Sequence, residues 1–99
     1  MKEDIYASSN AEIAASLGGR LRDYRKRMGL TRRALAERSG ISEFTIGAFE
    51  RGDNPGLSLQ SLLALLRALG ELEQIAGLLP ALPPSPQEVF ERERNKLRK

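Results

Sequence analysis

The 99-residue chain contains neither cysteine nor histidine. Without cysteine it has no disulfide framework, no thiolate ligand for a metal ion and no cysteine nucleophile. Without histidine it lacks the commonest general base and the commonest metal ligand. No paired carboxylates, phosphate-binding glycine loop or activated nucleophile can be recognised either. We therefore expect no enzyme, no metal, no cofactor and no small-molecule substrate.

Long apolar runs are absent too. No stretch approaches the roughly 20 apolar residues that cross a bilayer, and the run Met1 to Asp4 is too polar and acidic for a secretory signal. Hydrophobic residues make up 40% of the chain and charged residues 29%, a mixture typical of a soluble helical domain with an aliphatic core. We expect a cytoplasmic protein without a membrane partner.

The positive charge is concentrated in one segment. Residues 20–51 contain nine basic and four acidic side chains, and the tail 87–99 has five basic and three acidic ones. Residues 1–19 and 52–86 each have an excess of two negative charges. A charge run alone is most simply a solvated helix face, but a local basic segment also suits phosphate groups.

Apolar spacing and capping residues predict an all-α fold. A long helix should begin near Ser9 or Asn10, both good N-cap residues, and end before Gly29. Gly18-Gly19 lies in its middle and predicts a bend or a later start. Apolar residues recur in this helix at spacings of three and four positions, which places them on one face. They are Ile13, Leu17, Leu21, Tyr24 and Met28.

Two short helices are predicted next. Thr31 should cap a helix over 32–39 that ends at Gly40, and Ser42 should cap another that ends near Arg51. The apolar Ile41 should anchor the turn in the core. Two short helices with this turn, after a longer amphipathic helix, have the pattern of a helix-turn-helix. In that motif the second helix lies in the DNA major groove while the first crosses the backbone.

The C-terminal half begins with a leucine-rich segment. Ser58 should cap a largely buried helix that ends before Gly70, and a further helix is expected over Glu71–Leu79. Prolines predict extended chain over 80–86, followed by a charged helix or mobile tail over 87–99. The expected organisation is an N-terminal extension (1–9), one domain (10–79) and a proline-hinged basic tail that is flexible or helical (80–99).

The run from Arg22 to Gly52 closely resembles the Xre or Cro/CI-like family of phage and bacterial repressors. The similarity covers about residues 13–79, and three blocks occur in order: Leu35-Ala36, Gly40-Ile41-Ser42 and Phe49-Glu50-Arg51-Gly52. The resemblance implies a five-helix, lambda-repressor-like helix-turn-helix domain that binds double-stranded DNA. It implies a sequence-specific transcriptional regulator, namely a repressor that binds a pseudo-palindromic operator and regulates its own gene. It also implies a bacterial or phage protein that is associated with the nucleoid.

The resemblance also implies roles for individual residues. The residues implied to face the bases are Ser42, Glu43, Phe44, Thr45, Gly47 and Ala48. The residues implied to contact phosphates are Arg32, Arg51, Asn54 and Ser58. Glu43 suits a cytosine amino group and Phe44 a thymine methyl group, while Thr45 suits a base edge or a phosphate. Arg32 suits either a phosphate or an ion pair with Glu43.

Arg25 and Glu50 match a semi-buried ion pair of this family, between the first helix and the end of the third, so the resemblance implies a structural role for both. Gly47 and Ala48 depart from the family pattern, since relatives often carry polar side chains there. Direct base readout should therefore be sparse, with more weight on phosphate contacts and DNA shape. An acidic Glu43 facing DNA is also unusual.

The leucines beyond the motif leave two interpretations open. Leu63, Leu66, Leu78 and Leu79 either fill the core or exceed it and join two chains in a homodimer. The layout of domain, Leu-Leu-Pro junction and proline-hinged tail also resembles HipB-like antitoxins, which implies a toxin protein as a partner. A third hypothesis is a protein-interaction adaptor that has lost DNA binding. A steep decrease of DNA affinity with salt would exclude it.

Overall fold

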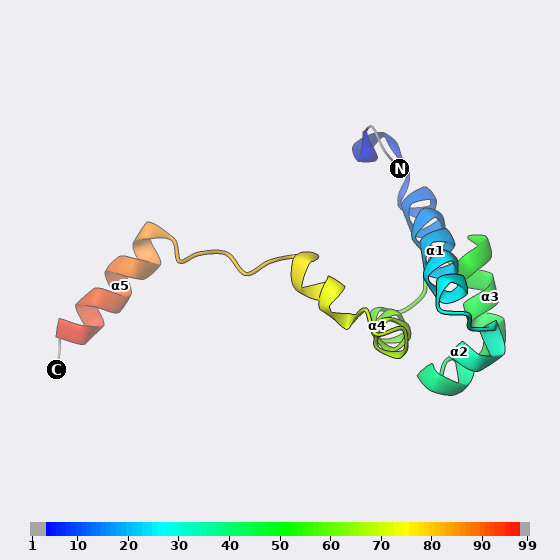
Figure 1. The fold of residues 1–99 in the computed structure, drawn as a ribbon. Helices are drawn as coiled ribbons and strands as arrows, with labels where there is room; N and C mark the ends of the chain where they lie inside the picture. Colours follow the sequence, from blue (N-terminus) through cyan, green and yellow to red (C-terminus); the bar gives the residue numbers. More distant parts are fainter. Residues whose placement is uncertain (1–3, 98–99) are drawn as a thin grey trace.

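The computed structural model describes residues 4–97, and within these bounds the chain is helical without any strand (Figure 1). The all-α prediction is confirmed for this part of the chain. The elements are η1 (Ile5–Ala7), α1 (Asn10–Arg27), α2 (Arg32–Ser39), α3 (Glu43–Arg51), α4 (Leu59–Ala68), η2 (Leu72–Gly77) and α5 (Pro86–Leu97), where η denotes a 3-10 helix. The ends of the expected N-terminal extension and basic tail, residues 1–3 and 98–99, lie outside the described residues.

Serine or threonine begins each of the first four α-helices, as predicted. The capping oxygens of Ser9, Thr31, Ser42 and Ser58 each accept a hydrogen bond from the backbone N–H three residues later. Ser9 and Glu12 form a complete capping box. Gly40 and Gly52 end α2 and α3 in the left-handed conformation, which side chains disfavour.

Helix α1 runs without interruption through Gly18-Gly19, so the alternative of a later start is wrong. Gly18 is needed there because α1 crosses α3 at that point. A Cβ atom at position 18 would lie 1.9 Å from the carbonyl oxygen of Phe49, whereas one at Gly19 would meet nothing within 4 Å. The absence of one side chain therefore allows two helix backbones to approach each other.

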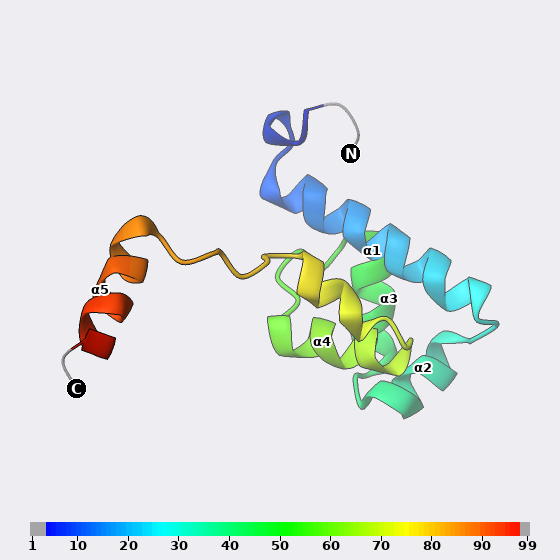
Figure 2. The same ribbon diagram turned by 60° about the vertical axis from the view of Figure 1, so that its left-hand side comes forward.

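The core is aliphatic apart from one phenylalanine and draws on all four helices. It consists of Leu21, Leu35, Ile46, Phe49, Leu65 and Leu69. Helix α1 packs on α3, and α2 packs on both α3 and α4 (Figure 2). Ile41, in the turn between α2 and α3, packs against this core as predicted. The core thus fixes the position of α3.

Two expectations for the leucine-rich segment are wrong. Helix α4 is not largely buried, because its leucines form one broad face and only part of that face meets the core. Leu65 is buried and Leu69 just after the helix is too, but Leu59 is 62% exposed. The expected helix over 71–79 is the shorter 3-10 helix η2, which has no side-chain cap and leaves Leu78 and Leu79 exposed.

The proline-rich segment 80–85 contains no helix, and α5 begins at Pro86, a residue suited to the first helical position. The N–H of Glu88 donates to Ser85 Oγ at 3.1 Å. In both Figure 1 and Figure 2 α5 lies apart from the bundle of α1 to α4, and none of its described residues is buried. Within residues 4–97 no helix combines the length and apolar character that a membrane span requires.

Candidate nucleic-acid interface

The turn between α2 and α3 is fixed by local hydrogen bonds. Gly40 has φ +78° and donates its N–H to the carbonyl of Ala36 at 2.9 Å. Ser42 Oγ accepts the N–H of Thr45 at 3.0 Å and donates to Thr45 Oγ1 at 2.8 Å. The first bond fixes the end of α2 and the other two fix the beginning of α3, so only a short turn connects the two helices.

The N-terminal end of α3 faces solvent. Ser42 and Glu43 are exposed, Phe44 is 79% exposed, and Thr45 is half-buried. Phe44 is thus a large apolar side chain that contributes nothing to the core. These four residues form a partly exposed surface at the beginning of α3.

Gly47 and Ala48 are buried in this structure, unlike the other residues that the resemblance implies to face the bases. A Cβ atom at position 47 would lie 3.1 Å from Arg51 Nη1 and 3.7 Å from Arg32 Cδ. The two arginine side chains therefore converge over Gly47. The contact of Arg51 with Gly47 could have been predicted from the sequence, because the two residues are four positions apart on one helix face. The contact of Arg32 could not.

Glu50 is the centre of a buried charge cluster. Its side chain is fully buried, and its carboxylate accepts from Arg25 Nε at 2.7 Å and Arg25 Nη2 at 2.9 Å. Arg25 also donates to the carbonyl of Leu30 at 2.8 Å, which ties α1 to the segment before α2. Arg25 and Glu50 thus form the ion pair that the resemblance implies.

Arg32 pairs with Glu50 and not with Glu43. Its Nε donates to Glu50 Oε1 at 3.1 Å, and its side chain is 42% exposed. The expected Arg32–Glu43 pair is therefore wrong. Sequence reasoning missed the pair with Glu50 because the two residues are 18 positions apart. One carboxylate now serves two guanidinium groups, so the cluster keeps an excess positive charge beside the motif.

The remaining candidates are the last residue of α3 and two residues that follow it. Arg51 Nε donates to Asp53 Oδ2 at 3.0 Å in an exposed pair. Asn54 is half-buried in the loop, and Ser58 Oγ caps α4 by accepting the N–H of Ser61. The N–H groups of the first turn of a helix have no intrahelical acceptor and attract anions. Among residues 4–97 no group of acidic side chains is arranged to hold a metal ion.

Comparison with known proteins gives two matches. A family model described as a helix-turn-helix domain matches residues 16–75, which extend from within α1 into η2. Over 51 residues the chain is 47% identical to an uncharacterized HTH-type transcriptional regulator of Methanothermobacter thermautotrophicus strain Delta H, in an alignment that covers 50% of this chain and 71% of that protein. No solved structure matches the chain. The family match leaves out the proline-rich segment and α5.

Proposed function

The chain belongs to the helix-turn-helix domain family, and from this membership we propose that it is a sequence-specific, DNA-binding transcriptional regulator. The observation that carries the proposal is the solvent-facing N-terminal end of α3, flanked by Arg32 and Arg51. The relative that is 47% identical is itself described as an HTH-type transcriptional regulator. Helix α3 is the proposed reading helix, and α2 crosses the DNA backbone.

Direct base contacts come from the first turn of α3. Glu43 accepts a hydrogen bond from a cytosine amino group, and Phe44 packs on a thymine methyl group. Ser42 and Thr45 hydrogen-bond each other and reach a base edge or a phosphate. Since Gly47 and Ala48 are buried, further along α3 no side chain from these two positions reaches a base. Specificity therefore depends partly on DNA shape.

Phosphate contacts come from the residues around this turn. Arg32 engages Glu50 through Nε, the only one of its nitrogens that hydrogen-bonds within residues 4–97, so its terminal nitrogens are available to a phosphate. Arg51 must exchange Asp53 for a phosphate, which is feasible because that pair is exposed. Asn54 and the N-terminus of α4 at Ser58 complete the set. Such contacts fix the register without reading sequence.

We further propose the Xre or Cro/CI type of this family, in the form of an autoregulating repressor that binds a pseudo-palindromic operator as a homodimer. The two-fold symmetry of a dimer matches inverted half-sites about one helical turn apart. The exposure of Leu78 and Leu79 supports the homodimer, because these two leucines contribute nothing to the core of a monomer and are available to a second chain.

A HipB-like antitoxin is the second candidate. The observation that favours it is α5, which lies apart from the DNA-reading bundle at the end of the proline-rich segment and is therefore accessible to another protein (Figure 1). Coexpression with the product of a kinase-type toxin gene in the same operon tests it. A stable complex supports the antitoxin, and separate elution of the two proteins excludes it.

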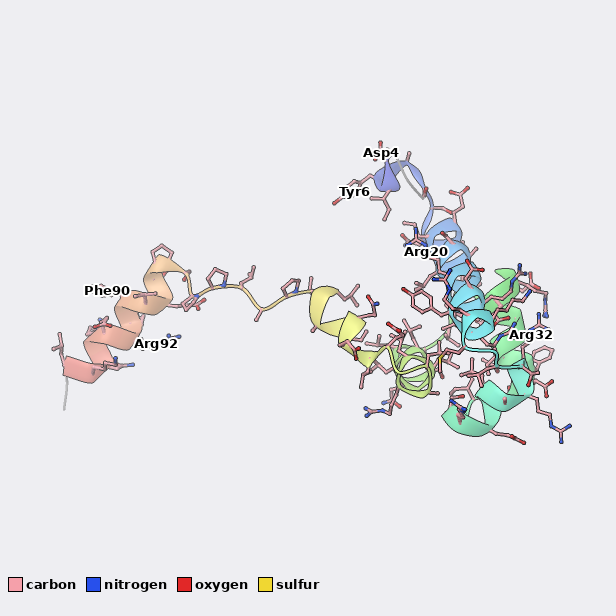
Figure 3. All side chains as sticks on the ribbon, viewed as in Figure 1. Asp4, Tyr6, Arg20, Arg32, Phe90 and Arg92 are labelled. Carbon is pink, nitrogen blue, oxygen red and sulfur yellow. The ribbon has the colours of Figure 1, made fainter. Side chains whose placement is uncertain are left out.

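Selection of genomic fragments by the purified protein at two salt concentrations tests DNA binding. We expect an inverted repeat upstream of the protein's own gene. In Arg51→Ala the slope of log affinity against log salt should become shallower by about 1, because one phosphate contact is lost. The matched control is Arg92→Ala, which removes the same charge from α5 (Figure 3). An absence of any salt-sensitive binding would instead favour the protein-interaction adaptor.

Asp53→Asn should strengthen DNA binding. The Asp53 carboxylate competes with phosphate for Arg51 and repels the DNA backbone. Exposed ion pairs of this kind contribute about 0.2–1 kcal/mol, so release of Arg51 should increase affinity by up to about fivefold. Fluorescence anisotropy with a labelled operator measures the change. An unchanged affinity would mean that Arg51 does not exchange partners on binding.

A further inference from the structure

An apolar groove lies between α1, α4 and η2 and encloses about 270 Å³. Its lining includes Leu17, Tyr24, Leu62, Leu66, Ile75 and Leu78. Leu17 is 40% exposed and Leu78 is 67% exposed, so water meets much of this surface. Helices η2 and α3 lie on opposite sides of the bundle in Figure 1. The groove is therefore separate from the proposed DNA-reading surface.

Helix α5 carries a second exposed apolar surface, and the Arg94 guanidinium of the same helix lies 5.9 Å from the centre of its Phe90 ring. Val89 is 43% exposed, Phe90 62% and Leu97 85%. At 3.6 residues per turn these three positions share one face of the helix. Glu93 lies within the same face, between Val89 and Leu97. Figure 3 shows Phe90 far from the bundle. An apolar helix face and an apolar groove are thus both unpartnered in one chain.

The proline-rich segment keeps α5 away from the groove of its own chain. Pro80, Pro83 and Pro84 each fix their φ angle, and six residues of polyproline-type chain span roughly 19 Å. This segment begins three residues after the end of η2 and carries α5 outward in both views. To reach its own groove, α5 would have to reverse direction within a stiff segment. A groove in another copy of the chain requires no such reversal.

The charges of the two surfaces are complementary. Arg20 lies at the edge of the groove and has no ion pair with any residue between 4 and 97. Glu93 of α5 likewise has none within this range, whereas its neighbours Glu91 and Arg94 pair with each other. Glu71 also lines the groove and keeps its negative charge, because its hydrogen-bond donor Gln74 is neutral. The one cation among the described lining residues, Arg20, therefore matches Glu93 on the helix face, while Glu71 lies beside that pair.

We propose that α5 of one chain docks in the groove of a second copy, and that the second copy returns the same contact. Phe90 fills the apolar groove and Glu93 pairs with Arg20 across the interface. The exchange is isologous, as a two-fold dimer requires, and leaves both α3 helices uncovered. This inference supplies an interface for the homodimer of the proposed function, but it does not depend on DNA binding.

Sedimentation equilibrium of the full chain tests the interface without DNA. We expect a dimer for the unsubstituted protein and a dissociation constant about 30-fold higher or more for Phe90→Asp, as for an aromatic residue at the centre of an interface. Asn95→Asp is the matched control, because it adds the same charge to the opposite face of α5 and should leave the dimer unchanged. All of these positions are exposed, so circular dichroism should show folded variants.

Charge reversal then identifies the partner chain. Arg20→Glu and Glu93→Arg should each weaken the homodimer about tenfold, which corresponds to 1.4 kcal/mol. An equimolar mixture of the two single variants should recover dimer of unsubstituted affinity, because the heterodimer restores both opposite-charge pairs. Docking within one chain predicts no recovery on mixing.

A protein that stays monomeric, a dimer insensitive to Phe90→Asp, or no recovery on mixing would each overturn the inference. If a monomer bound the operator in a salt-dependent way, the proposed α5 interface would be wrong and the proposed DNA binding would stand. A stable dimer that binds no DNA would overturn only the proposed function.

Discussion

Gly18→Ala is expected to destabilise the protein by about 3 kcal/mol, at the upper end of the range for an overpacked core. The added Cβ atom would lie 1.9 Å from the carbonyl oxygen of Phe49 and 2.8 Å from its carbonyl carbon. Both are backbone atoms of α3, which cannot rotate away as a side chain can. The two helices must therefore move apart, and the buried contacts between them loosen. Urea denaturation followed by circular dichroism at 222 nm measures the loss.

Gly19→Ala is the matched control for this prediction. A Cβ atom at position 19 would meet nothing within 4 Å, and the residue lies in the same helix interior. Alanine is favoured over glycine there by about 0.5–1 kcal/mol, so this variant should be more stable than the unsubstituted protein. Opposite signs at adjacent positions would separate tertiary packing from helix propensity. If Gly18→Ala also stabilised the protein, the close approach of α1 and α3 would be incorrect.

Helix boundaries could be predicted because their causes are local. Each capping serine or threonine bonds a backbone N–H only three residues away, and glycine ends α2 and α3 through its own φ angle. The same reasoning failed for Gly18-Gly19. Propensity treats both glycines as weak points in a helix, whereas the reason for Gly18 lies 31 positions away at Phe49.

The limits of prediction in the candidate site have the same origin. The residues before and within the first turn of α3 are exposed because the turn directs them outward, and the local pattern indicated this for Ser42 and Glu43. The burial of Gly47 depends partly on Arg51 of the same helix and partly on Arg32 of another helix, which the local pattern does not reveal. The leucines of α4 indicated an apolar helix but not how much of its apolar face is buried. The buried fraction depends on which other elements pack against the helix.

Glu50→Gln is expected to destabilise the protein by about 3–5 kcal/mol, the usual result of removing one partner from a buried ion pair. Glutamine keeps the volume of the side chain, so no cavity forms. It leaves Arg25, whose side chain is 7% exposed, without a counter-charge, and it places amide hydrogens against the guanidinium donors. Native proteins are stable by only about 5–15 kcal/mol, so this loss should lower the thermal midpoint markedly.

Asp53→Asn is the control for the chemical change itself. It replaces a carboxylate by an amide in another arginine pair, at 3.0 Å from Arg51, but here both side chains are more than half exposed. Exposed pairs contribute about 0–1 kcal/mol, because water already solvates both charges. Similar losses for Glu50→Gln and Asp53→Asn would contradict the view that burial makes the Glu50 cluster important.

Removal of both charges should restore much of the lost stability. In a variant with Arg25→Met and Glu50→Leu no unpaired charge remains in the interior, and apolar replacements of buried ion pairs are often neutral or stabilising. Two smaller losses remain. The carbonyl of Leu30 loses its donor, at about 1 kcal/mol, and Arg32 loses its carboxylate but is 42% exposed and can turn to water. If the double variant were as unstable as Glu50→Gln, the attraction between Arg25 and Glu50 would itself hold α1 against α3.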